Sequence, residues 1–297
     1  MRTRRHVLIP FSTRGTRRVL CVLYGLLLDV VASRSRRFLE IEGIKTKFVS
    51  FVADVAHRRD QAHLPPPNVF VLDVGANAGT FSQSMLRRLH NAAPRVNPRL
   101  IVFEPQEQFR ASLSKMIKQS DGGELVAAAA WIEETNLTFH LFKNSESASL
   151  VSSSSDAASS ARTGAITVRA VDLAEYLRHT LPDPSPSDPN ATLAFLKLDI
   201  EGGEYDVLPR LLGTRALCRV RFLLIEWHLK KAPLEKRVAG LHILAALRQI
   251  LESSCRPGPA PVVVYDEMPM LNDNVTLPGD RRVGDHHELV QRRGRLT

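Results

Sequence analysis

A strand, a glycine turn and a helix follow one another between Val69 and Leu89, and this order constrains the fold more than any other segment. The apolar run that starts at Val69 is typical of a buried parallel strand, and Asp73 lies near its carboxyl end. Gly75 and Gly79 then frame a turn where backbone can approach a ligand closely. This order predicts the nucleotide-cofactor half-site of an open α/β sheet, and we therefore expect an enzyme.

The turn differs from the two common phosphate-binding loops. Its glycines are spaced G-x-x-x-G, and Asn77 stands where the G-x-G-x-x-G dinucleotide fingerprint has its middle glycine. No Lys-Ser/Thr pair follows Gly79, which excludes a P-loop. The carboxylate of Asp73 suits a positively charged cofactor such as S-adenosylmethionine, with its ammonium and sulfonium groups. We expect this cofactor to be bound by Asp73, Gly75, Asn77 and Gly79.

Glu104 ends the next apolar run, which begins at Arg99. Its distance from the glycine turn is close to that at which such sheets place an acidic residue against a ribose diol. An alternative is that Glu104 caps a helix starting near residue 106. Together with the turn before it, the position predicts cofactor binding by Glu104.

A third apolar run ends in Asp199 and is followed by Glu201 and a double glycine, and a fourth ends in Glu226 and His228. Ligands bind at the carboxyl ends of strands in open α/β sheets. We therefore expect one rim of the sheet to gather six ionisable side chains: Asp73, Glu104, Asp199, Glu201, Glu226 and His228.

Six segments in this order resemble the FkbM family of S-adenosylmethionine-dependent methyltransferases: LDVGANAGTFS, VFEP, AAAAW, VRAVDLAEYL, FLKLDIEGGEYDVL and LLIEWH. The resemblance runs from about Val69 to His228, and KLDIEGGE is its most specific part. It implies a class I methyltransferase fold with seven strands flanked by helices, and O-methylation of a hydroxyl.

The expected architecture is a Rossmann-like α/β sheet, mostly parallel, with helices on both faces and an antiparallel last strand from about residue 285. We divide the chain into a basic arm with a short hydrophobic segment (1–37), a helical lead-in with a proline linker (38–67) and the methyltransferase domain (68–297).

Removal of the acceptor's hydroxyl proton is the step for which catalytic residues are sought. An alcohol is nearly uncharged at neutral pH, so a general base or a metal should assist. Asp199 is the first candidate, followed by Glu201 and His228. The spacing of Asp199, Glu201 and Glu226 allows a divalent cation without predicting one. Glu201 and Glu204 also suit the N-terminus of the helix that follows them.

The net charge of +9 is concentrated in the N-terminal arm. Residues 1–37 hold nine arginines and one aspartate, which leaves +1 for the rest of the chain. Nucleic-acid binding normally requires a basic face on the domain itself, so we expect no nucleic-acid partner.

The arm also contains the apolar segment 19–32, which is shorter than the roughly 20 residues that span a bilayer and is interrupted by Asp29. It suits membrane association or organelle targeting, and the alternative is a helix packed on the domain of a cytoplasmic protein.

Three scattered cysteines without a C-x-x-C pair argue against a disulfide scaffold and a cysteine-ligated zinc. Sequons occur at Asn136, Asn190 and Asn274.

We therefore expect an S-adenosylmethionine-dependent O-methyltransferase acting on a glycan, lipid-linked or small-molecule hydroxyl. One alternative is a nicotinamide-dependent oxidoreductase, which the missing middle glycine disfavours. Another is a membrane-tethered scaffold with an inactive methyltransferase-like domain.

Overall fold

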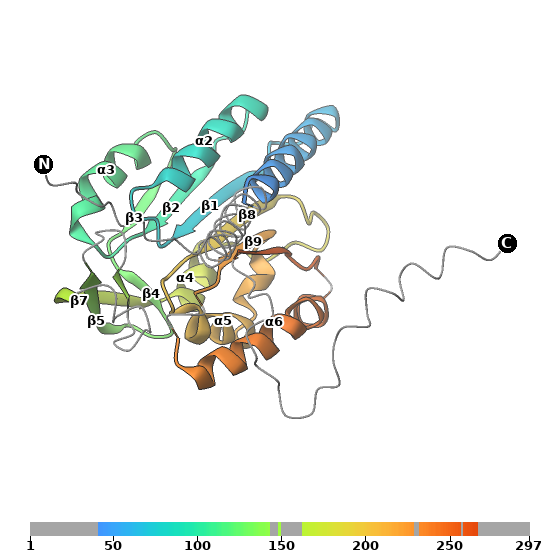
Figure 1. Cartoon of the computed structure of the whole chain (residues 1–297). Coiled ribbons are helices and arrows are strands. Elements are labelled where there is room, and N and C mark those ends of the chain that lie inside the picture. Colours follow the sequence, from blue (N-terminus) through green and yellow to red (C-terminus); the bar gives the residue numbers. More distant parts are fainter. Residues whose placement is uncertain (1–40, 143–147, 150–161, 229–231, 257, 267–297) are drawn as a thin grey trace, which may run out of the picture. The chain divides into compact units, whose positions relative to one another are not determined.

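A computed structural model describes residues 41–142, 148–149, 162–228, 232–256 and 258–266, and these lie in one compact unit. Its centre is a six-stranded parallel sheet in the order β10-β9-β8-β1-β2-β3 (Figure 1). The strands are β1 (Asn68–Val74), β2 (Arg99–Phe103), β3 (Glu124–Val126), β8 (Thr192–Leu198), β9 (Phe222–Glu226) and β10 (Val262–Asp266).

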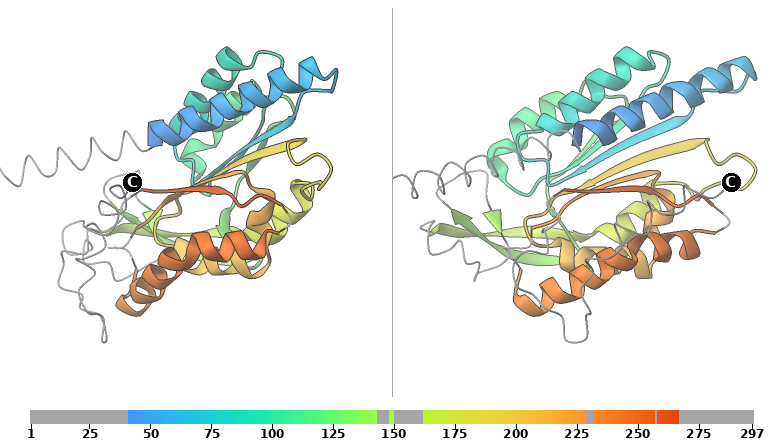
Figure 2. Two further views of the ribbon diagram at one scale, coloured as in Figure 1. Left: turned by 90° about the vertical axis from the view of Figure 1, so that its right-hand side faces the viewer. Right: turned by 45° about the vertical axis from the view of Figure 1, so that its right-hand side comes forward.

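Helices cover both faces of this sheet (Figure 2). One face carries α2 (Thr80–Ala92), α3 (Glu107–Ile117) and a helix over residues 41–61, and the other carries α4 (Leu173–Thr180), α5 (Glu204–Gly213) and α6 (Leu234–Ser254). The predicted α/β Rossmann-like fold is confirmed. The predicted antiparallel strand from residue 285 lies outside the described residues.

The apolar run of β1 is continuous because the strand is buried on both faces. Val69 and Val71 pack with the helices of the first face, and Leu72 and Val74 pack with those of the second. By the same alternation Asp73 points to the first face, where α2 lies. The side of the sheet on which Asp73 lies therefore determines which groups it can contact.

A smaller sheet in the order β4-β7-β5-β6 stands beside the main one. It contains β4 (Ala129–Trp131), β5 (Thr135–Phe142), β6 (Ala148–Ser149) and β7 (Arg162–Asp172). Residues 124–130 do not form one continuous strand: the chain turns after Val126, whose carbonyl accepts a hydrogen bond of 2.8 Å from Ala128 N, and enters the second sheet.

A disulfide joins Cys218 to Cys255, with an S–S distance of 2.11 Å. Cys218 lies in η2 (Ala216–Arg219) and Cys255 caps α6, and packing of these two elements brings together cysteines 37 residues apart. The expectation against disulfides was wrong because it rested on spacing in the sequence alone.

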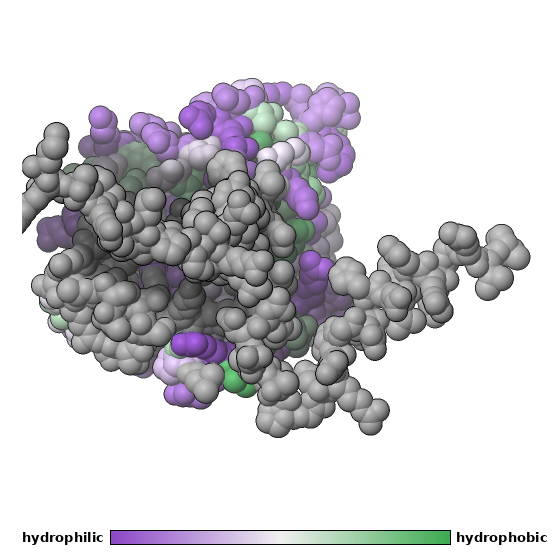
Figure 3. Space-filling model, in the orientation of Figure 1, coloured by the Kyte–Doolittle hydropathy of each residue, from purple (hydrophilic) through white to green (hydrophobic). Residues whose placement is uncertain are grey.

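The helix over residues 41–61 packs Ile44, Phe48 and Val52 into the core beside β1 and β8. Hydrophilic side chains predominate among the coloured residues on the face drawn in Figure 3. No helix of the described ranges has the length and hydropathy required to cross a bilayer. The apolar segment 19–32 lies outside those ranges, and its membrane association stays a prediction.

Candidate active site

A cavity opens at the carboxyl ends of β1, β2 and β8. The strand order reverses between β1 and β8, and this is the point at which open α/β sheets bind ligands. Five of the predicted site residues line it: Gly75, Asn77, Glu104, Asp199 and Glu201.

Gly75 allows the end of β1 to pass directly against the end of β8. Its φ is 83°, and a Cβ at this position would lie 1.7 Å from the carbonyl oxygen of Asp199. In the same place Asp199 N donates a hydrogen bond of 3.0 Å to Val74 O. Every other residue type would separate the two strand ends that form the cavity floor.

Glu104 is held by the backbone at the end of β2. Its carboxylate accepts hydrogen bonds from Asn77 N at 2.8 Å and from Gln106 N at 2.9 Å. Burial raises the pKa of Glu104, and the two backbone N–H groups partly offset this rise. A carboxylate offers about four lone-pair positions, so Glu104, which also has a side-chain hydrogen bond with Gln106, keeps acceptor capacity for a ligand in the cavity.

Asp73 and Gly79 do not line the cavity. Asp73 is fully buried and accepts a hydrogen bond of 2.6 Å from Ser82 Oγ, in the first turns of α2. A Cβ on Gly79 would lie 2.8 Å from Leu113 Cδ2 and 2.9 Å from Met116 Cε. Both residues support the turn from beneath, and their predicted contact with a cofactor stays a prediction.

Lys197 is a buried cation that sequence reasoning missed. Its Nζ donates to Asp199 Oδ2 at 2.6 Å and lies 3.6 Å from Asp73 Oδ1 and 3.7 Å from Glu226 Oε1. Burial lowers the pKa of Lys197, but these three carboxylates more than reverse this, so the ammonium stays charged. The available signal was a lone lysine within the apolar run of β8, since lysine is rarely buried without a partner.

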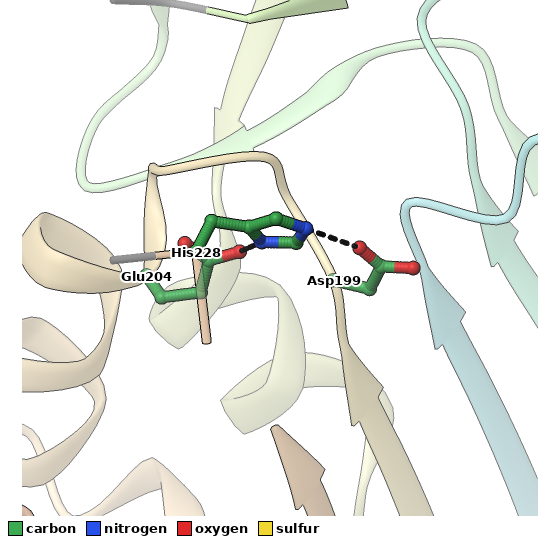
Figure 4. A group of neighbouring side chains, drawn as sticks. All are labelled: Asp199, Glu204 and His228. Atoms are coloured by element: carbon green, nitrogen blue, oxygen red, sulfur yellow. Dashed lines mark hydrogen bonds and ion pairs between the residues drawn. The ribbon is translucent and has the colours of Figure 1, made fainter. Parts of the chain in front are cut away.

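His228 lies between carboxylates from two sides (Figure 4). Its Nδ1 is 2.9 Å from Glu204 Oε1, and its Nε2 is 3.6 Å from Asp199 Oδ1 and 3.5 Å from Glu201 Oε2. Glu201, in the turn after β8, has a φ of 58°, a conformation that costs a non-glycine residue energy and is often found at functional sites. The predicted catalytic residues Asp199, Glu201 and His228 are thus neighbours.

Glu204 is fully buried and fastens the loop that carries these residues. Its two carboxylate oxygens accept hydrogen bonds of 2.9 Å from Ile200 N and Gly202 N. Glu204 lies in the first turn of α5, as the sequence suggests, but its hydrogen bonds go to the loop before the helix and to His228, 24 residues away in the sequence.

Burial alone would lower the pKa of His228, but its hydrogen bond with Glu204 and the carboxylates of Glu204, Asp199 and Glu226 raise it to about 9. The imidazole is therefore mostly protonated at pH 7 and acts as a hydrogen-bond donor to the carboxylates around it.

A pH dependence of stability follows. The folded-state pKa of about 9 exceeds the usual 6.5, so the stabilising contribution of His228 is complete below 6.5 and is lost as pH rises through about 9. We expect His228→Gln to cost about 3 kcal/mol at pH 6, and much less at pH 10. Urea unfolding of both proteins at pH 6, 8 and 10 measures this difference. A difference that does not change with pH would contradict the assigned protonation state.

Asp199, Glu204 and His228 each offer an atom within 4.8 Å of the others, a geometry that a metal ion could also use. This differs from the set of Asp199, Glu201 and Glu226 considered from sequence. Without a metal these groups form a hydrogen-bonded cluster in which Glu204 accepts two backbone hydrogen bonds, and a metal would have to displace the proton of His228.

The sheet order, the cavity at the reversal point and its acidic lining define an α/β enzyme domain of the nucleotide-cofactor type. The family model described as Methyltransferase FkbM domain matches residues 73–255, more than half of the chain. The chain therefore belongs to the FkbM methyltransferase family, which confirms the resemblance seen in the sequence. Comparisons with curated proteins and with solved structures gave no match.

Proposed function

We propose that the protein is an S-adenosylmethionine-dependent O-methyltransferase whose acceptor is a hydroxyl of a glycan, a lipid-linked compound or a small molecule. The observation that carries the cofactor assignment is the charge of the cavity. Glu104, Asp199 and Glu201 line it, and its described lining contains no lysine, arginine or histidine. The acceptor class rests on the family resemblance.

This charge distribution separates the two cofactor classes considered from sequence. A sulfonium and an ammonium are attracted by carboxylates, and the attraction is strong at short range in a partly buried site. A pyrophosphate would be repelled by the same carboxylates and would find no cation among the described lining residues. The cavity therefore favours S-adenosylmethionine over a nicotinamide dinucleotide.

The residues present fit this cofactor. Glu104 has lone pairs to accept hydrogen bonds from a ribose diol, as acidic residues at this strand end do in related sheets. Phe103 and Phe139, with the small side chains of 128–130, give an apolar wall that suits an adenine ring. Gly75 keeps the floor free of a side chain.

S-adenosylmethionine, when bound, supplies an electrophilic methyl group. The methyl carbon would exchange its bond to sulfur for a bond to the acceptor oxygen, with S-adenosylhomocysteine as the leaving group, and we assign the hydroxyl proton that is released to the carboxylate of Asp199. Asp199 lines the cavity, while Lys197 and protonated His228 hold its two oxygens from behind. His228 is a positioning residue here, because a group with a pKa of about 9 is already protonated at neutral pH. Glu201, 3.5 Å from His228 Nε2, orients the same cluster.

Replacing Glu104 with glutamine tests the cofactor assignment. The amide keeps the volume but removes the charge, and loss of one charge-assisted hydrogen bond costs about 1.5–3 kcal/mol. We expect affinity for S-adenosylmethionine to fall by about 10–150-fold, measured by titration calorimetry with S-adenosylmethionine and S-adenosylhomocysteine.

Glu107→Gln is the matched control, because Glu107 is an exposed carboxylate three residues away whose contact is Arg110 at 3.5 Å. NADH is titrated in parallel. Tight binding of NADH alone would support the oxidoreductase instead, and binding of neither ligand by the folded protein would support the inactive scaffold.

A further inference from the structure

Two features that methyl transfer does not require are found together in this structure: a disulfide and accessible N-glycosylation sequons. From them we infer that the chain matures in an oxidising secretory lumen and carries N-linked glycans at Asn136 and Asn190. The ligand class is a preassembled oligosaccharide transferred from a lipid-linked pyrophosphate donor. A bond forms between the anomeric carbon and the side-chain amide nitrogen of each asparagine, the bond from that carbon to the phosphate oxygen breaks, and the lipid pyrophosphate leaves as the amide gives up a proton.

The disulfide between Cys218 and Cys255 indicates the compartment in which the chain folds. Disulfides persist in secreted and luminal proteins and are rare where glutathione keeps thiols reduced. Cys218 and Cys255 come from different elements, and the side chain of Cys255 is 5% exposed. Two cysteines placed in bonding contact between η2 and α6 indicate a structural bond in an oxidising environment.

Asn136 lies on the outer face of the small sheet. It is the second residue of β5, it is exposed, and Thr138 of the same sequon is exposed on the same face. Leu137 and Phe139 alternate with them and point inward. A glycan at Asn136 would therefore extend into solvent, on the side of β5 opposite to Phe139, which lines the cavity.

Asn190 lies in a turn directly before β8. The turn is closed by a hydrogen bond of 3.1 Å from Ala191 N to Asp188 O, and Thr192 of the sequon begins the strand. The side chain of Asn190 is partly exposed and forms no hydrogen bond with another residue of the described ranges. The turn stands at the amino end of β8, whereas the cavity lies at its carboxyl end, so a glycan here leaves the active site open.

The sequence agrees with this assignment without being needed for it. An arginine-rich segment followed by the apolar run 19–32 has the order of charge and hydrophobicity that directs chains to membranes. The inference is independent of the proposed reaction, since neither asparagine belongs to the cofactor or acceptor site.

The test is expression of the full chain, with an epitope tag, in a eukaryotic cell, followed by electrophoresis with and without an enzyme that removes N-linked glycans. We expect the untreated protein to migrate more slowly. Asn136→Gln and Asn190→Gln should each remove one mobility step. Thr138→Ser and Thr192→Ser, which preserve the sequons, should keep both steps and are the matched controls.

Thr138→Ala and Thr192→Ala separate loss of the sequon from loss of folding, because they leave the asparagines in place and should remove the same steps. A wild-type chain whose migration is unchanged by deglycosylation would overturn the inference. So would complete alkylation of Cys218 and Cys255 in the absence of a reducing agent. A step that persists in Asn136→Gln or in Asn190→Gln would overturn the assignment of that residue.

Discussion

Asp199→Asn is expected to lower the turnover number of methyl transfer by about 10²–10⁴-fold and to lower the affinity for S-adenosylmethionine by a much smaller factor. The amide has the shape of the carboxylate but cannot take up a hydroxyl proton. Asp199 lines the cavity, and its two oxygens face Lys197 and His228. The substitution therefore reduces the rate of reaction and leaves Glu104 in place, because Glu104 is held by other groups.

The measurement is transfer of labelled methyl groups to hydroxylated acceptors, with the turnover number separated from KM, and calorimetry for the cofactor. Asp54→Asn is the matched control, since Asp54 forms an exposed helix ion pair with Arg58 at 2.6 Å. This substitution should leave the turnover number unchanged. A folded Asp199→Asn protein with full turnover would move proton removal to another residue of the rim, with Glu201 next.

The main sheet could be predicted from sequence because its signals are local. The strand–turn–helix that begins at Val69 is found as β1 and α2, and the helix runs over Thr80–Ala92. A strand that is buried on both faces and a helix with one apolar face can each be recognised from the order of residues within the segment itself. The topology rule then placed the strand-end residues Glu104 and Asp199 in one cavity without any contact being known.

Asp73 shows where local reasoning stops. Nearness to a strand end does not determine to which face a side chain points, because successive residues alternate. Asp73 shares the face of Val71 and therefore meets Ser82 of α2 and the Lys197 ammonium, beneath the cavity floor.

The remaining features depend on pairs that are distant in the sequence. Glu204 and His228 are 24 residues apart, and Cys218 and Cys255 are 37 residues apart. The raised pKa of His228 exists only when the loop after β8 and the end of β9 are side by side. A single sequence does not show which distant residues are in contact. For this reason the sequence suggests His228 as a general base, whereas in the folded protein it is a protonated hydrogen-bond donor.

Lys197→Met is expected to destabilise the protein by about 3–5 kcal/mol at pH 7, the cost of removing one partner from a buried ion pair. The methionine fills the volume but leaves Asp73, Asp199 and Glu226 as neighbouring carboxylates without the cation between them. Urea unfolding measures the loss. Lys236→Met is the matched control, because Lys236 pairs with Asp206 at 2.6 Å but is 43% exposed and should cost less than about 1 kcal/mol.

The same variant distinguishes a charge effect from a packing effect. Without the ammonium, three ionised carboxylates lie close together in the folded protein and repel one another. Acid neutralises carboxylates and removes this repulsion, so the difference in stability from the wild type should be smaller at pH 4.5 than at pH 7. A deficit that is equal at pH 4.5 and pH 7 would show that Lys197 contributes through packing and not by neutralising the carboxylates beneath the cavity.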